Sequence, residues 1–225
     1  MDIQIIYKIL NYISVFLALI IILPAHEFAH GFAAVKCGDF TPKIYSRYTL
    51  NPLAHFDLTG LICFMFAGFG WAKPMPINPN NFRNYKKGSF LVAIAGVTTN
   101  YSLAFLSLPL YILAYSYIPD FGFFTYVLVN TLFLLYHLNL VFFIFNLIPV
   151  YPLDGFRVID VFANKRSKIY YVLRYYGIYL LYILIALSIL ADFTGLSQLN
   201  ILGFIIDKLV GYISLPIRWF WGLIF

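Results

Sequence analysis

Long apolar segments separated by short polar ones run through most of the chain. Four of them are long enough to cross a bilayer as helices: residues 9–35, 89–118, 123–147 and 170–190. A helix needs about 20 apolar residues to cover the roughly 30 Å of hydrocarbon in a membrane. The pattern therefore predicts four transmembrane helices. A last apolar stretch, residues 199–225, carries three charged side chains and leaves open whether it spans the membrane or lies at its surface.

The connection between the first two spans, residues 39–77, follows a different pattern. Residues 39–48 mix polar and β-branched side chains and are expected to form a strand or loop, and residues 51–57 are rich in turn formers. Residues 58–69 are apolar but too few to cross a membrane. Residues 68–76 place proline at alternate positions, which excludes a helix. We therefore predict a small membrane-associated β or re-entrant element here.

The composition agrees with a membrane protein, because 62% of the residues are hydrophobic and 11% are charged. Soluble domains are about half apolar and a quarter charged. The expected fold is an all-α polytopic membrane protein with a single domain over residues 1–225. The first apolar run lacks a small-residue cleavage site, so we interpret it as a retained span and not as a signal peptide. Cys37 and Cys63 are expected to be free thiols.

The net charge of +6 raises the question of a nucleic-acid partner, but the positions of the cations favour another explanation. Only Lys8, Lys208 and Arg218 lie away from the connections that the helix count puts on one side. The other cations fall in or beside those connections: Lys36, Lys43, Arg47, Lys73, Arg83, Lys86, Lys87, Arg157, Lys165, Arg166, Lys168 and Arg174. By the positive-inside rule that side is cytoplasmic. We therefore expect no nucleic acid, a lipid bilayer around the chain, and a first span that runs inward through a plasma or inner membrane.

The first span contains an H-E-x-x-H sequence formed by His26, Glu27 and His30. Residues four apart share a helix face, so both imidazoles can bind one Zn²⁺ while Glu27 lies beside the water that the metal would hold. Glu27 is the only glutamate in the chain. The alternative is a pair of hydrogen-bonded helix histidines with a buried acidic partner. An unpaired acid at the centre of a span costs about 2.5 to 3.5 kcal/mol, which favours the ligand role.

A catalytic zinc takes three protein ligands, and the preferred third ligand is Asp154. It directly follows the third span, where Pro149 and Pro152 break the helix and Gly155 permits a bend. There the chain can turn back into the bundle if protein shields it. Asp154 and His30 are both expected toward the cytoplasmic leaflet. The alternative is that Asp154 caps a helix over residues 155–162.

Small residues in the second span suggest a close contact between helices near the site. Gly96 would let another helix approach, and Asn100 could hydrogen-bond across that contact. The alternative is ordinary packing of small residues. His137, in the third span, is interpreted as a packing residue.

Three motifs together resemble the site-2 protease family of intramembrane zinc metalloproteases. They are His26-Glu27-Phe28-Ala29-His30, Asn146-Leu147-Ile148-Pro149 and Leu153-Asp154-Gly155. Residues 51–57, 70–74 and 95–100 are further similar to the compact bacterial branch, although Val97 stands where proline is common. The resemblance covers about residues 23–155, and no stretch is left for a PDZ or CBS domain. It implies a site-2 protease-like helical core.

The resemblance also implies a role for each of these residues. His26, His30 and Asp154 would bind one Zn²⁺ per chain, and Glu27 would take a proton from water and pass it to the leaving amine. Asn146 would donate its amide to the substrate backbone or oxyanion, with helix packing as the alternative. His55 is expected to be an auxiliary donor near the site or simply a loop residue.

The expected activity is an endopeptidase acting in regulated intramembrane proteolysis. Its substrates would be transmembrane segments of single-pass proteins or signal-peptide remnants, cut near the cytoplasmic leaflet. The alternatives are a membrane metal-binding or transport protein, and an inactive homologue acting as a chaperone. The near absence of ionisable groups in the second and fourth spans disfavours transport, and the retained Glu27 disfavours an inactive homologue. The oligomeric state and the individual substrate are left open.

Overall fold

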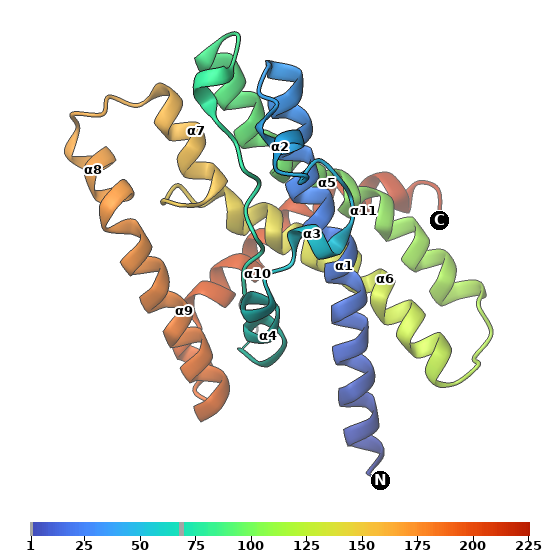
Figure 1. The fold of residues 1–225 in the computed structure, drawn as a ribbon. Coiled ribbons are helices and arrows are strands. Elements are labelled where there is room, and N and C mark those ends of the chain that lie inside the picture. Colours follow the sequence, from blue (N-terminus) through green and yellow to red (C-terminus); the bar gives the residue numbers. More distant parts are fainter. Residues whose placement is uncertain (1, 68–69) are drawn as a thin grey trace.

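Three long helices form the centre of the fold in the computed structural model, which describes residues 2–67 and 70–225. They are α1 (Ile3–Cys37), α5 (Tyr85–Tyr117) and α6 (Phe123–Leu147), and each contacts the other two along its length (Figure 1). The helix α7 (Asp154–Phe162) follows α6 and packs against α5. This arrangement brings α7 back to the part of α1 that carries the histidines.

The remaining helices lie around this centre. The helices α8 (Lys168–Tyr175) and α9 (Gly177–Thr194) stand at one side of the molecule (Figure 1). The helix α10 (Ile201–Ile213) packs against α6, and α11 (Leu215–Gly222) packs against α5. A 3₁₀ turn, η2 (Ser197–Leu199), connects α9 to α10.

Among the described residues four helices are long and apolar enough to cross a membrane: α1, α5, α6 and α9. The structure is therefore consistent with the predicted all-α, multi-pass membrane protein, and the number of candidate spans equals the number predicted. The bounds predicted for the third span, 123–147, are those of α6. The helix α1 ends at Cys37 because Gly38 adopts a left-handed conformation (φ 110°) and its N–H bonds back to Ala34 and Val35.

Two of the predicted apolar segments are divided in the structure. The segment 170–190 is wrong as a single span, because α8 ends at Tyr175 and α9 begins at Gly177. Charged Lys168 and Arg174 make α8 amphipathic, which does not suit lipid on all sides. The stretch 199–225 forms α10 and α11, of 13 and 8 residues, and neither reaches the roughly 20 residues that a span needs.

Short helices occupy much of the region predicted as β or re-entrant. They are α2 (Thr41–Ile44), α3 (Pro52–His55) and α4 (Leu58–Ala67), followed by the 3₁₀ turn η1 (Pro79–Asn81). No β-strand occurs in the part of this region that the structure describes, so the β element is not shown there, and the chain between the short helices forms turns and loops. The re-entrant placement stays a prediction, and Gly68 and Phe69 lie outside the described residues.

Backbone chemistry explains why these segments do not form strands. The Asp39 carboxylate accepts from the Thr41 N–H at 3.0 Å and so starts α2. Farther along, one isolated antiparallel bridge joins Phe56 to Ala72. The chain from there is extended, but Pro74 and Pro76 have no N–H to donate, so the pairing cannot continue as a ladder.

Candidate metal centre

The helix α1 places His26 and His30 one turn apart, facing the interior of the bundle. Their side chains are buried, and their Nε2 atoms lie 3.0 Å from each other. His30 is seven residues before the end of α1, which is roughly 10 Å along the helix axis. The pair therefore lies inside the apolar helix and not in a surface loop.

Asp154 reaches the two histidines from the first turn of α7. Its Oδ2 atom is 3.3 Å from His26 Nε2 and 3.1 Å from His30 Nε2. The alternative role as a helix cap is wrong, because Asp154 is the first residue of α7 and the capping position belongs to Leu153. A Cβ on Gly155 would lie 2.6 Å from the carbonyl carbon of Leu147, so only glycine lets α7 fold back against the end of α6.

The other ring nitrogen of each histidine has its own acceptor. His26 Nδ1 lies 2.5 Å from Asn100 Oδ1, and His30 Nδ1 lies 2.7 Å from the carbonyl oxygen of Val92. A carbonyl oxygen can only accept, so each Nδ1 carries the proton and each Nε2 keeps its lone pair. Both imidazoles are therefore held in the tautomer that binds metal through Nε2.

A second asparagine fixes the orientation of the first. The Asn100 amide N–H donates to Asn139 Oδ1 at 2.9 Å, and the Asn139 amide donates to the Leu135 carbonyl at 2.7 Å. Asn100, placed by sequence at a helix contact, thus orients His26. Sequence reasoning missed Asn139; the available signal was a second amide in the middle of an apolar span, where a polar side chain needs a partner.

Gly96 on α5 is required by the histidine pair. A Cβ at this position would lie 2.7 Å from His26 Nε2. Any side chain here would push α5 away from α1 or displace the imidazole. The close approach predicted at Gly96 is therefore an approach to the histidine rings themselves.

The donor atoms of this cluster fit a divalent metal ion. Two nitrogen lone pairs and one carboxylate oxygen face one another at 3.0 to 3.3 Å, and Asp154 Oδ2 accepts no hydrogen bond from any described residue. Ligands of a tetrahedral zinc at 2.0 to 2.1 Å are about 3.3 to 3.4 Å apart. Three atoms that can only accept need a cation between them. The donor set also leaves a fourth tetrahedral position for water.

Glu27 lines the same cavity as the three candidate ligands. This cavity has a volume of about 670 Å³ and is bounded by α1, α4, residues 70–74, the end of α6, and α9. Glu27 Oε2 accepts from the Met75 N–H at 2.6 Å. The only N–H between Pro74 and Pro76 therefore holds the carboxylate beside the cluster.

Two further candidate residues from the sequence, Asn146 and His55, differ in whether they line the cavity. Asn146 lines the cavity, and its amide N–H donates to the Phe142 carbonyl one turn earlier at 3.1 Å. His55 is fully buried, is not among the residues lining the cavity, and binds the Thr49 carbonyl through Nε2 at 2.7 Å. His137 stacks on Phe133, which agrees with a packing role.

Arg157 is a cavity residue that sequence reasoning did not select. It lies one turn after Asp154 on α7, and its Nη1 atom is 3.6 Å from Asp154 Oδ1. The i, i+3 spacing of an acid and an arginine on a helix was the available signal. Asp154 thus directs one oxygen to the histidines and the other to Arg157.

The structure is that of a helical protein with four candidate membrane spans among its described residues and a buried His-His-Asp cluster whose donor atoms fit a metal ion. The chain is 41% identical over 145 residues to the protein named "Putative zinc metalloprotease YwhC" from Bacillus subtilis (strain 168). The match spans 64% of this chain and 66% of that relative, just under two thirds of its length. No family model and no solved structure matches the chain. This similarity to a protein named as a zinc metalloprotease supports the resemblance to the site-2 protease family that the motifs indicated.

Proposed function

We propose that the protein is a zinc-dependent intramembrane endopeptidase of the site-2 protease type. The observation that carries this proposal is the buried triangle of His26, His30 and Asp154, with Glu27 in the same cavity, on a helix apolar enough to span a membrane. The name of the Bacillus subtilis relative supports metalloprotease chemistry. One Zn²⁺ per chain would occupy the cluster.

The residues of the site suit hydrolysis of a peptide bond. Bound zinc would supply a Lewis acid that polarises the carbonyl and lowers the pKa of water toward about 7. Glu27 would accept a proton from the attacking water, whose oxygen bonds to the carbonyl carbon, and would pass that proton to the nitrogen as the C–N bond breaks. The Met75 N–H would keep the Glu27 carboxylate oriented for both transfers.

Asn146 is proposed to bind the substrate in the same cavity. One amide N–H is committed to the Phe142 carbonyl, which leaves a second N–H and the amide oxygen for a peptide backbone. His55 is proposed to support the loop that carries the extended segment, because its own carbonyl accepts from the Lys73 N–H at 2.8 Å.

A transmembrane substrate is expected to unwind before it is cut. A transmembrane helix hides its carbonyls in its own hydrogen bonds, so the carbonyl of the bond to be cut has to leave the helix before it can reach the metal cluster. We propose that single-pass membrane proteins or signal-peptide remnants enter as extended chains, and that residues 70–76 hold them by adding a strand.

The active site is proposed to face the cytoplasm. The end of α1, the start of α5 and the connection between α7 and α8 lie at one end of the molecule, opposite the N-terminus (Figure 1). These segments carry five of the 15 Lys and Arg residues, namely Lys36, Lys86, Lys87, Lys165 and Arg166. The positive-inside rule then puts this end on the cytoplasmic side of a plasma or bacterial inner membrane.

The Glu27→Gln variant tests the proposed function. Glutamine keeps the size of the side chain but cannot accept the proton, so cleavage of a model transmembrane substrate should fall by about 10² to 10⁴-fold. Zinc, measured by inductively coupled plasma mass spectrometry, should stay near one per chain because Glu27 is not a ligand. A variant that cleaves at the wild-type rate would refute the assigned base, and a zinc-free wild type would refute the metal.

A further inference from the structure

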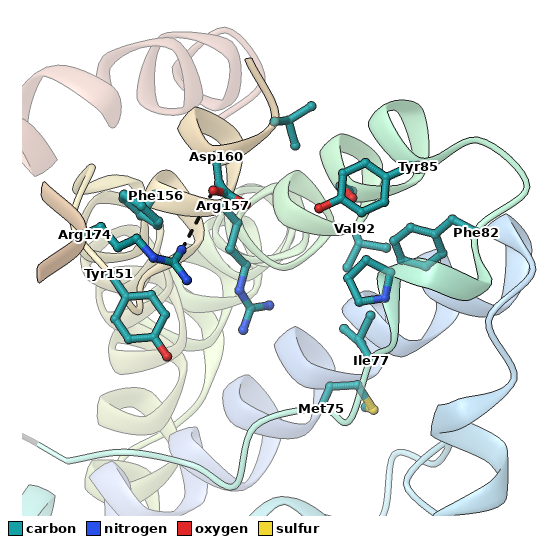
Figure 2. Close-up of a pocket in the computed structure, with 13 residues that line it drawn as sticks. Met75, Ile77, Phe82, Tyr85, Val92, Tyr151, Phe156, Arg157, Asp160 and Arg174 are labelled. Atoms are coloured by element: carbon teal, nitrogen blue, oxygen red, sulfur yellow. Dashed lines mark ion pairs between the residues drawn. The ribbon is translucent and has the colours of Figure 1, made fainter. Parts of the chain in front are cut away.

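A second cavity, of about 480 Å³, lies beside the one that holds the metal cluster. Figure 2 shows residues of α7 and α8 on one side of it and residues of α5 and the extended segment on the other. Arg157 and Tyr151 line both cavities. The Arg157 side chain therefore stands where the two cavities meet.

The two arginines of the second cavity have different surroundings. Arg174 lies 3.8 Å from Asp160 and donates to the Tyr170 hydroxyl at 3.3 Å, and its guanidinium lies over the ring of Tyr151 at 5.7 Å. Asp160 is also 3.4 Å from Lys165. Arg174 thus has an ion pair that joins α8 to α7, a hydrogen bond and a ring contact, and Asp160 has two cations within 4 Å.

Arg157 has no comparable set of partners. Across the described residues its guanidinium makes one ion pair, the 3.6 Å contact with Asp154 Oδ1, and no hydrogen bond within normal distance. Figure 2 shows the guanidinium pointing into the space between Tyr151 and Met75, away from Asp160. A guanidinium carries five N–H donors, so most of them face the cavity without a protein acceptor.

We propose that Arg157 binds a carboxylate of the peptide substrate or product at the place where the two cavities meet. This inference rests on the proposed protease function. A planar guanidinium fits a carboxylate with two parallel hydrogen bonds, and such bonds are among the strongest in proteins. Peptide hydrolysis creates a new C-terminal carboxylate at the metal cluster, next to this side chain. An acidic side chain of the substrate is the other source of the same group.

Binding of paired peptides tests the proposal in the zinc-loaded protein. A fluorophore-labelled apolar nonapeptide with a free C-terminal carboxylate is compared with its carboxamide, by anisotropy in detergent. A second pair, both carboxamides, differs only by Glu or Gln at the central position. In at least one pair, the wild type should bind the peptide that carries the carboxylate at least about tenfold more tightly than its neutral counterpart, as expected for a charge-assisted contact. The pair that discriminates identifies the source of the carboxylate.

Substitutions of Arg157 and of a nearby cation separate its contribution from that of the metal. In Arg157→Gln the ratio of the affinities for the acidic and the neutral peptide should fall at least tenfold, and in Arg157→Lys it should fall less. The control Arg166→Gln removes the same charge from the exposed α7–α8 connection and should keep the preference. Zinc content and melting temperature establish that each variant is folded and loaded.

Several outcomes would overturn the proposal. They are no binding by the wild type, equal affinity within both pairs, or a preference that Arg157→Gln retains. Zinc loss with equal weakening of acid and amide would show that Arg157 only supports Asp154. A wild type that fails to cleave any transmembrane substrate removes the proposed function, whereas cleavage with an unchanged Arg157 variant removes this inference alone.

Discussion

Two buried aspartates lie in two different regions of this molecule, and their carboxylates differ in the hydrogen bonds that they accept. Asp39, in the connection after α1, accepts from Thr41 N at 3.0 Å, from Asn78 N at 2.8 Å and from Asn81 Nδ2 at 2.8 Å. Asp154 directs an oxygen at His26 and His30 and accepts no hydrogen bond there from the described residues. A buried carboxylate whose oxygens all accept hydrogen bonds stabilises the fold. A buried carboxylate oxygen that accepts none and faces the lone pairs of two imidazole nitrogens is positioned to bind a cation.

The Asp154→Asn variant should give the largest change. The amide keeps the shape of the side chain but removes the charge that a metal needs, so zinc and cleavage should both be lost. The effect should exceed the about 10- to 100-fold that follows loss of an outer partner. The fold should persist, because Asp154 Oδ2 accepts no hydrogen bond from the residues that the structure describes. Metal analysis measures the zinc content, and circular dichroism measures whether the helical fold persists. Stoichiometric zinc in this variant would contradict the ligand assignment.

The Asn100→Ala variant removes the acceptor that holds His26 Nδ1. Zinc affinity should fall about 10- to 100-fold, as is usual when the partner of a metal-binding histidine is lost. Competition with a chromogenic chelator gives the affinity. The matched control is Asn130→Ala, which removes a half-buried amide on α6 that donates to Asn11, and the zinc affinity of this variant should not change. Equal effects of the two substitutions would show that Asn100 does not orient the histidine.

The Gly96→Ala variant tests the close approach of α5 to the histidines. The added methyl would overlap the His26 ring, so we expect a loss of about 1 to 3 kcal/mol in stability together with weaker zinc binding. Gly211→Ala on α10 is the control, because a Cβ there meets nothing within 4 Å. Thermal unfolding in detergent compares the two, and an unchanged melting temperature and zinc affinity for Gly96→Ala would contradict the geometry.

The Asp39→Asn variant should give the smallest change in zinc binding and the opposite signature to Asp154→Asn: stability falls while zinc stays bound. Burial alone would raise the pKa of the Asp39 carboxyl, but the hydrogen bonds from Thr41, Asn78 and Asn81 outweigh it and lower the pKa. Its contribution to stability is therefore present above the unfolded pKa of about 3.9 and is lost as the pH falls through that value toward the folded pKa. The variant should be less stable by about 1 to 3 kcal/mol at pH 7.

A pH series distinguishes this loss from a general effect of charge. The wild type should lose stability between about pH 5 and the folded pKa, and Asp39→Asn should show less of this dependence while still binding zinc. Asp192→Asn removes an exposed carboxylate that makes no hydrogen bond or ion pair with the described residues, and this variant should behave as the wild type. Zinc loss in Asp39→Asn at neutral pH would remove the distinction between the two aspartates.

Much of the fold followed from local patterns. The length and apolar character of α1, α5 and α6 predicted three spans, and α9 is the fourth, although it begins at Gly177 and not at Tyr170. The β element predicted in residues 39–77 is not shown in the described part, where Pro74 and Pro76 lack the N–H donors that a strand ladder needs. Whether a residue has a partner across a sheet depends on segments far away in the chain.

Some residues of the candidate site could be found from local spacing, and others depend on tertiary packing. The spacing of His26 and His30 sets a shared face, because a helix repeats every 3.6 residues. Asp154 could be selected among eight aspartates only as a preference, and the structure brings it to the two rings. Asn139 and Arg157 could not be selected, since their roles depend on how α6 and α7 are rotated against α1.

The amino-acid sequence alone determined that this protein consists of apolar helices and that two imidazoles and one glutamate lie together on the first of them. Those features are local, and helix periodicity with bilayer thickness is enough to derive them. The tertiary structure decided which carboxylate meets the imidazoles, which carbonyls hold their protons, and which arginine faces the neighbouring cavity. Such contacts depend on the packing and rotation of whole helices, which no short stretch of residues specifies.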